Sequence, residues 1–242
     1  MNEFFVALGM AVSMFTVLPL SGARWEDRLR PLATLLLPVV GLGIGLIWFG
    51  IAALAKALPA HLGGALIAAA PWLLTGFIHL DGFLDASDAL LSWRPQEERQ
   101  RILKDVHVGA FAVVSLALLS LFQFAAAMEL RRIGALVFLP VLSRCGSARC
   151  ALTMPKLGHS EYAGMDAGKE SARMIDALAL VSLLALALMY GWAGVGVGVV
   201  ALAAYAAAMA VSVRAVGGFS GDLAGYALTV SELCGLIALA LL

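Results

Sequence analysis

The sequence predicts an all-α integral membrane protein: a bundle of about seven to eight transmembrane helices that forms a single membrane domain over residues 1–242. Hydrophobic residues make up 62% of the chain, charged residues only 13%, and the mean hydropathy is +0.95. Soluble domains are nearer half apolar and a quarter charged. The apolar residues also gather in runs of roughly 20, the length that an α-helix needs to cross a bilayer.

Eight hydrophobic segments are candidate spans. Their approximate ranges are 4–20, 32–57, 62–80, 108–127, 133–152, 174–190, 193–213 and 223–241. The first is the shortest, so it either spans or lies in the membrane interface. Only a Gly191-Trp192 turn separates the sixth from the seventh, which predicts an antiparallel hairpin. The GxxxG pairs that begin at Gly41 and Gly194 permit close helix packing.

Basic residues are divided unevenly between the two ends of these spans. Four loops on one side carry eleven of the sixteen Lys and Arg residues; they cover residues 21–31, 81–107, 153–173 and 214–222. The opposite side has only Lys56, Arg131 and Arg132. Because cytoplasmic loops are enriched in Lys and Arg, the side with the four loops is predicted to be cytoplasmic. Most acidic residues lie there too, so the polar chemistry is expected at the cytoplasmic face.

Three aspartates at the end of the third segment are the most unusual feature of the sequence. Asp81, Asp85 and Asp88 stand at i, i+4 and i+7, so an α-helix would place them within about 60° of arc. Like charges on one stripe repel each other, and Mg²⁺ binds one or two carboxylates together with substrate phosphates. We therefore predict a metal site for phosphate chemistry; the alternative is a solvated first turn of a loop helix. His79, about 160° away, is interpreted as a substrate contact or a core histidine.

Charged residues near two other segments are expected to act with this stripe. Lys104 and Asp105 precede the fourth segment, and a short return loop would make Asp105 a fourth carboxylate, enough for two metal ions. Arg144 lies inside the fifth segment, where an arginine usually faces a cavity or a partner. Its expected partners are the carboxylates or an anionic substrate. Snorkelling to the membrane surface is the alternative for Lys104 and for Arg149.

A glycine-rich turn, Gly217-Gly218-Phe219-Ser220-Gly221-Asp222, opens the last segment. Backbone N–H groups of such turns bind phosphate well at helix N-termini. The candidate substrate contacts in this turn are Gly217, Gly218, Gly221 and Asp222. Asp222 would alternatively serve as an N-cap. No Walker A, GxSxG or HExxH motif is present, no basic tract suggests nucleic acid, and the three cysteines form no CxxC pair.

Together these segments resemble one protein family. The matching motifs are His79-Leu80-Asp81-Gly82-x-x-Asp85-x-x-Asp88, Lys104-Asp105 with Gly109, Ser143-Arg144, and Gly217-Gly218-x-Ser220-Gly221-Asp222. In this order, from end to end of the chain, they resemble the cobalamin synthase family, the adenosylcobinamide-GDP ribazoletransferases. The sequence departs from the family pattern at Ala89, His107 and Ser220, where glycine, arginine and threonine are common. These departures bear on individual residue roles more than on the family.

The resemblance implies a Mg²⁺-dependent transferase in the bacterial inner (plasma) membrane that completes the nucleotide loop of cobalamin. It would join adenosylcobinamide-GDP to α-ribazole or its 5′-phosphate, form adenosylcobalamin or its 5′-phosphate, and release GMP. The catalytic and metal-binding residues would come from Asp81, Asp85, Asp88 and Asp105. Asp88 is our choice for the base that takes the ribazole hydroxyl proton. Lys104 and Arg144 would neutralise phosphate oxygens, and the Gly217–Gly221 turn would hold one.

Two rival hypotheses remain at this point. A CDP-alcohol phosphotransferase would have Ala-Arg where this chain has Asp85-Ala86. An ion-coupled transporter would spread its acids at mid-membrane depth in repeated halves, and the sequence has no convincing internal repeat. The expected partners are the two substrates and the lipid bilayer, without nucleic acid. The sequence leaves open the acceptor's phosphorylation, the number of metal ions and the oligomeric state, a homo-oligomer included.

Overall fold

The computed structural model describes residues 2–18, 25–158 and 169–242, and these are almost entirely helical. The α-helices are α1 (Glu3–Phe15), α2 (Arg30–Leu35), α3 (Leu37–Ala55), α4 (Ala60–Leu74), α5 (Ile78–Leu91), α6 (Gln96–Ile102), α7 (Ala110–Met128), α8 (Leu139–Thr153), α9 (Lys169–Val216) and α10 (Gly221–Ala240). Two 3-10 helices, η1 (Asp27–Leu29) and η2 (Ile133–Val137), precede α2 and α8. Within the described ranges the only β-type pairing is an isolated bridge between Lys156 and Phe219. The predicted all-α class is confirmed.

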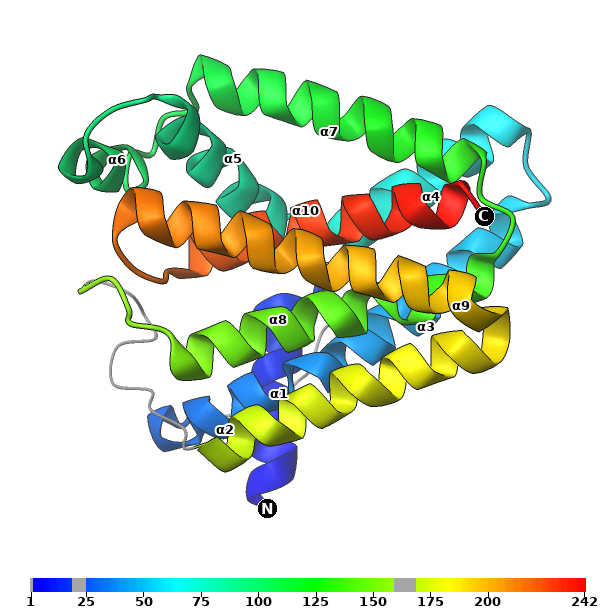
Figure 1. Cartoon of the computed structure of the whole chain (residues 1–242), viewed down its shortest axis with the longest axis horizontal. Coiled ribbons are helices and arrows are strands. Elements are labelled where there is room, and N and C mark those ends of the chain that lie inside the picture. The colour runs from blue at the N-terminus through cyan, green and yellow to red at the C-terminus, as the bar shows by residue number, and fades with distance from the viewer. Residues whose placement is uncertain (1, 19–24, 159–168) are drawn as a thin grey trace.

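The long helices lie roughly side by side, so the connections gather at two ends of the molecule (Figure 1). The end with α6, which we call the α6 end, also holds α2, the 154–158 segment and the turn that leads into α10. The opposite end holds the α3–α4 and α7–α8 connections, the bend of α9 and the C-terminus. These two groups of connections are the two sides expected from the hydrophobic segments.

Five helical segments are long and apolar enough to cross a membrane, or six if the bent pair α4–α5 is one span, among the residues described. One of the five, α9, consists of two arms joined at Gly191, where φ is 62° and ψ is −148°. In Figure 1 the two arms run in opposite directions and diverge from the bend toward the α6 end. The predicted hairpin is therefore confirmed. Counting its arms separately brings the total to seven, within the predicted range.

The predicted span 62–80 is wrong as one continuous helix. α4 and α5 meet at an angle of 90° across residues 75–77. Gly76 and Phe77 both adopt left-handed backbone angles, with φ of 58° and 65°, which stop the helix. Apolar character continues through the break, so hydropathy alone could not reveal it. Because of this bend, α5, which carries the aspartates, packs against α10 in a direction different from that of α4.

α1 does not have the length of a span. Its 13 residues cover about 20 Å, whereas a bilayer core is about 30 Å thick. In Figure 1 it runs across the direction of the long helices. Its end is tied to the bend, because the Val17 N–H donates to the Leu74 carbonyl at 3.0 Å. The structure thus favours the interfacial alternative for the first segment.

Glycines allow the helices to pack closely. A Cβ added at Gly41 or Gly45 of α3 would overlap the carbonyl groups of Pro140 and Val137. The close packing predicted for this GxxxG pair is confirmed. α10 lies at the centre of the bundle and contacts α5, α7, α8 and α9, so it is the common wall against which the site is built.

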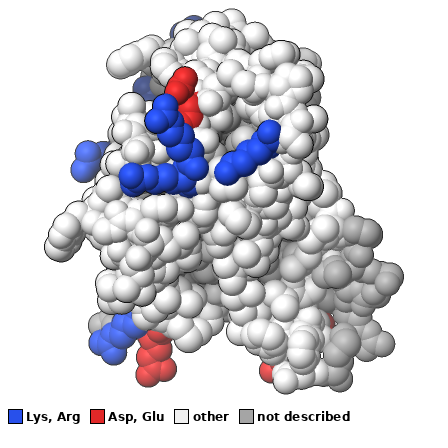
Figure 2. Space-filling model, turned by 90° about the vertical axis from the view of Figure 1, so that its right-hand side faces the viewer, with Lys and Arg blue, Asp and Glu red and all other residues white. Residues whose placement is uncertain are grey.

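The end opposite α6 carries little charge. Lys56, Arg131 and Arg132 lie in its connections. Figure 2 views this end and shows basic side chains gathered in its upper part, on a mostly uncharged surface. The other basic loops within the described ranges lie at the α6 end. The asymmetry of charge expected from the sequence is therefore an asymmetry between the two ends of the bundle.

Candidate active site

A cavity of about 440 Å³ lies at the α6 end, between the ends of α1, α5, α8 and α10 and the connection after α6. The predicted site residues that line it are His79, Asp81, Lys104, Arg144, Gly221 and Asp222. The predicted residues that do not line it are Asp85, Asp88, Asp105, Gly217 and Gly218. Much of the remaining wall is apolar. The fold thus brings residues from four separate sequence motifs to one cavity.

α5 reaches the cavity because two glycines let it press against α10. A Cβ at Gly82 would lie 2.8 Å from the Asp222 carbonyl oxygen, and one at Gly225 would lie 3.1 Å from the His79 carbonyl oxygen. Side chains at either position would hold the helices apart. The two helices pack antiparallel (Figure 1), so Asp81 comes level with Asp222.

Three carboxylates form what we call the acid cluster: Asp81, Asp85 and Asp222. Asp81 and Asp222 line the cavity from α5 and α10. Asp85 is half-buried one turn from Asp81, and the negative charges that act on it are, in order, Asp81, Asp222 and Asp88. Asp222 of α10 therefore adds a carboxylate to those predicted on α5. Such mutual repulsion favours binding of a cation.

Asp88 has a different environment from the cluster. It is buried, its Oδ2 accepts the Gly109 N–H at 2.6 Å, and its Oδ1 accepts the Ala112 N–H at 2.9 Å. It thereby caps the N-terminus of α7 from another helix, where a negative charge is favoured. A Cβ at Gly109 would lie 2.5 Å from the same carboxylate, so only glycine fits there. This geometry favours a structural role for Asp88 over the predicted role of general base.

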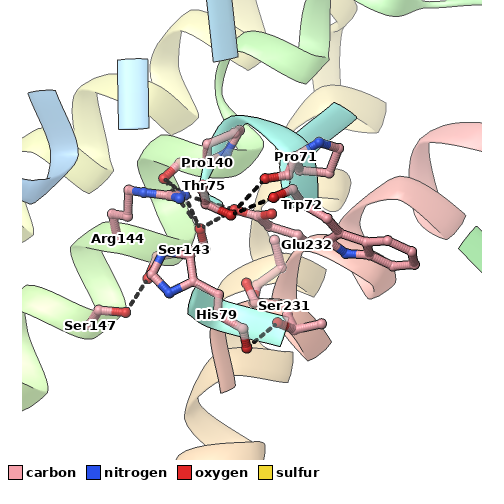
Figure 3. Close-up of polar contacts among 12 residues, drawn as sticks. Pro71, Trp72, Thr75, His79, Pro140, Ser143, Arg144, Ser147, Ser231 and Glu232 are labelled. Carbon is pink, nitrogen blue, oxygen red and sulfur yellow. Dashed lines mark hydrogen bonds and ion pairs between the residues drawn. The ribbon is translucent and has the colours of Figure 1, made fainter. Parts of the chain in front are cut away.

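Arg144 is bound within the protein (Figure 3). It is 1% exposed, and its Nη1 donates to Glu232 of α10 at 2.8 Å. The Ser143 hydroxyl donates to the same carboxylate at 2.9 Å. The expected partners of Arg144 were the aspartates or an anionic substrate, but in this structure its charge is compensated by Glu232. His79 lies beside this group in Figure 3, and its ring stacks on Phe15 with centroids 5.9 Å apart.

The glycine-rich turn is held mainly by protein contacts. Phe219 exchanges backbone hydrogen bonds of 2.9 Å with Pro155 and Leu157. Gly217, at φ 97°, packs against the Gln96 side chain. The Ser220 hydroxyl caps α10 by accepting the Leu223 N–H at 3.3 Å. These contacts position the start of α10, and only Ser220, Gly221 and Asp222 of its polar and glycine residues reach the cavity.

The connection between α6 and α7 contributes Leu103 and Lys104 to the cavity. Lys104 is exposed and lines it. Asp105 is exposed and faces His107, whose ring Nδ1 lies 2.7 Å from its carboxylate. The His107 backbone N–H donates to the same carboxylate at 3.0 Å. Both contacts lower the pKa of the Asp105 carboxyl, and the ring contact is the larger cause. The predicted approach of Asp105 to the other aspartates as a metal ligand is absent from this arrangement.

Comparison with known proteins decides the family. The profile of the family described as "Cobalamin-5-phosphate synthase" matches residues 7–240, almost the whole chain. The chain belongs to this family. The resemblance given by the sequence motifs is therefore confirmed, and the rival phosphotransferase and transporter hypotheses lose their support.

Curated relatives of this cobalamin-5-phosphate synthase family member match over essentially their full length. A Clostridium perfringens protein (strain SM101) is 36% identical over 253 residues, covering 100% of both chains. A Clostridium botulinum protein (strain Eklund 17B) is 38% identical over 248 residues, covering 98% of both. A Pseudomonas savastanoi protein is 34% identical over 250 residues, covering 100% of both. All three are named adenosylcobinamide-GDP ribazoletransferase. No solved structure matches the chain.

The acid cluster fits a metal ion that the substrate helps to hold. Within the described ranges, no three His, Cys, Asp or Glu side chains are grouped closely enough to hold a metal by themselves. The predicted set of four carboxylates is not assembled, because Asp88 caps α7 and Asp105 bonds to His107. Mg²⁺ usually takes one or two carboxylates and completes its shell with water and substrate phosphates. Two carboxylates facing one cavity meet that requirement.

Sequence reasoning missed several residues of the site. Glu232 lies in an apolar segment, and an acid at membrane depth is itself a signal for a polar partner. Glu232 contacts the lining residue Arg144 without lining the cavity itself. Phe15, Gln100 and Ser147, in contrast, do line it. These three residues belong to no sequence motif. They reach the site only because the helices that hold them pack around the cavity.

Replacing Asp88 by Asn tests its structural role. The substitution keeps the size but turns an amide N–H toward backbone donors, so we expect a loss of about 1–3 kcal/mol in the free energy of unfolding. Transfer by the folded enzyme should fall by less than about tenfold, whereas loss of a general base costs about 10²–10⁴-fold. Unfolding in detergent and initial rates would be measured beside the exposed control Glu98→Gln. Normal stability with a loss of about 10²-fold or more would restore the base assignment.

Proposed function

We propose that this protein is an adenosylcobinamide-GDP ribazoletransferase that acts in cobalamin synthesis and requires Mg²⁺. The observation that carries the proposal is the match over almost the whole chain to the family and its named relatives. The cavity holds groups that suit such a reaction, because carboxylates from α5 and α10 line it together with Lys104. Phosphoryl transfer depends mainly on positioning and on neutralising charge.

In the proposed reaction, a hydroxyl oxygen of α-ribazole, or of its 5′-phosphate, attacks the phosphorus nearer cobinamide. The new O–P bond forms as the bond from that phosphorus to the GMP oxygen breaks, so GMP leaves. The hydroxyl proton passes to a carboxylate of the acid cluster, Asp81, Asp85 or Asp222, that is not engaged with metal. Lys104 neutralises a phosphate oxygen at the cavity rim.

The acid cluster would hold the metal in this proposal. When bound, Mg²⁺ would offset the charge of the phosphate oxygens and of the departing GMP. Asp81 and Asp222 are its proposed ligands because they line the cavity, and Asp85 adds negative charge beside them. Gly82 and Gly225 position these carboxylates by keeping α5 against α10.

The proposal is tested by incubating the purified protein with adenosylcobinamide-GDP and α-ribazole. GMP and a corrinoid that has gained ribazole should appear in equal amounts. Omission of ribazole or addition of EDTA should stop both. Absence of GMP release with either ribazole or its 5′-phosphate, in a folded preparation, would contradict the proposed function.

We also propose that the α6 end faces the cytoplasm of the bacterial plasma membrane. In a background with the three native cysteines replaced by alanine, single cysteines would be placed at the exposed residues Glu98 and Trp192. An impermeant thiol reagent added to intact cells should label Trp192→Cys and leave Glu98→Cys unlabelled until the cells are permeabilised. Labelling of Glu98→Cys in intact cells would reverse the orientation.

A further inference from the structure

The cavity has two levels along the helix axes. At the outer level, on the side of the α6–α7 connection and of the turn into α10, lie Asp81, Lys104 and Asp222. At the inner level lie His79 and Arg144; His79 is level with Gly225, three residues further into α10. On α8, Arg144 and the outer lining residue Ala151 are seven residues apart, which is about 10 Å along a helix.

The charged side chain that the described part of the chain places at the inner level is compensated. Among the described residues, the only cation that lines this level is Arg144, whose Nη1 is 2.8 Å from the Glu232 carboxylate. Both side chains are buried, so each charge depends on the other. A diphosphate placed there would compete with Glu232 for one guanidinium. An uncharged group suits this level better.

Two nitrogen atoms at the inner level are buried and make no hydrogen bond to the described residues: His79 Nε2 and Arg144 Nε. Buried polar atoms normally have a partner, which a ligand can supply. The surrounding wall is apolar and aromatic, with the Phe15 ring nearly parallel to the His79 ring at an interplanar angle of 14°. Flat rings stack well in such surroundings, and a few polar groups in an apolar pocket fix a ligand's orientation.

We propose that the inner level is the binding site for the uncharged benzimidazole base of the acceptor, α-ribazole. This inference rests on the proposed function. The base has two flat faces, apolar methyl groups and one ring nitrogen that accepts a hydrogen bond, which Arg144 Nε–H supplies. With the base at the inner level, the ribose hydroxyls lie at the outer level beside the acid cluster. The cavity, at about 440 Å³, admits a nucleoside but no corrin ring.

The diphosphate of the activated corrinoid then stays at the outer level with Lys104 and the metal. Two consequences distinguish this arrangement from one with guanine in the inner level. α-Ribazole binds without Mg²⁺, because none of its inner contacts involves the metal. GMP does not compete with it for this site.

In the same arrangement, Glu232 is a positioning residue. It engages Arg144 Nη1 and thereby fixes the plane of the guanidinium, so that Nε–H is directed to the base. The Ser143 hydroxyl bonds to the same carboxylate and orients it. Substitution of Glu232 is therefore expected to raise the KM for ribazole and to leave the KM for adenosylcobinamide-GDP unchanged.

The test is isothermal titration of the full-length protein in detergent with α-ribazole, in EDTA so that no transfer occurs. We expect one site per chain in wild type. Phe15→Ala and Glu232→Gln should each weaken binding by about tenfold, the effect of losing one good contact. Asp81→Asn should leave ribazole affinity within about twofold while abolishing transfer. Ser231→Ala, a buried neighbour that bonds to Ala201, is the matched control and should bind normally.

Steady-state rates complete the test. Phe15→Ala should raise the KM for α-ribazole about tenfold and leave the KM for adenosylcobinamide-GDP unchanged; a merely structural defect would change both. Displacement of ribazole by GMP in EDTA, or normal ribazole affinity in Phe15→Ala, would overturn the proposal. Either result could occur in an enzyme that still releases GMP. Conversely, ribazole binding with these variant effects but without GMP release would contradict the proposed function and leave the base site standing.

Discussion

Replacement of Asp81 by Asn is expected to reduce transfer by at least about 10²–10³-fold, the range found when a group that stabilises transition-state charge is removed. Asp81 lines the cavity and stands beside Asp85 and Asp222. The substitution keeps the shape of the side chain and removes one negative charge. GMP release from adenosylcobinamide-GDP and α-ribazole would be followed at saturating substrates and Mg²⁺.

The same substitution should not harm the fold. Since the acid cluster is mutually repulsive, the unfolding temperature of Asp81→Asn without metal should equal or exceed that of wild type. Glu98→Gln, an exposed acid on α6, is the matched control and should keep its activity within about twofold. A folded Asp81→Asn variant that transfers at the wild-type rate would show that the chemistry lies elsewhere.

Glu232→Ala is expected to destabilise the protein by about 3–5 kcal/mol, since breaking a buried ion pair leaves its other member without compensation. The stranded residue would be Arg144, which is 1% exposed inside α8. The Ser143 hydroxyl would also lose the shorter of its two hydrogen bonds to acceptor oxygens and keep the one to the Pro140 carbonyl. Denaturant or thermal unfolding in detergent would measure the loss, with Ser231→Ala as the control on the same helix.

A double variant distinguishes the effect of an unpaired buried charge on stability from the effect of lost side-chain packing. Arg144→Met combined with Glu232→Leu replaces the pair with apolar side chains, which is often neutral or stabilising. We expect it to recover most of the stability lost in Glu232→Ala and to remain defective in ribazole binding. A Glu232→Ala variant as stable as wild type would mean that Arg144 reaches another acceptor when Glu232 is absent.

The fold could be predicted from the sequence wherever one apolar run makes one helix. The runs at 108–127 and 223–241 became α7 and α10, and the hairpin at Gly191 followed from a glycine between two runs. The prediction was wrong at 62–80, where hydropathy continues across a 90° bend. Pro71 and Gly76 were the available signals, but prolines and glycines are common in membrane helices and do not by themselves reveal a break.

The site could be predicted in its residue types but only partly in its arrangement. Helical spacing placed Asp81, Asp85 and Asp88 on one helix, and all three lie on α5. It could not foresee that the N-terminus of α7 would bind Asp88, because that contact joins residues 21 and 24 positions apart. Nor could it place Asp222 with the cluster, since the approach of α5 to α10 depends on long-range packing at Gly82.

The central claim is that the acid cluster and the substrate's diphosphate together bind the metal. Electron paramagnetic resonance with Mn²⁺ in place of Mg²⁺ tests it most directly, by titrating free Mn²⁺ with protein in the presence and absence of adenosylcobinamide-GDP. Tight binding by wild type is predicted only when the substrate is present, beyond what the substrate binds alone, and it should disappear in Asp81→Asn. Equal Mn²⁺ binding by wild type and Asp81→Asn in the presence of substrate would contradict the account.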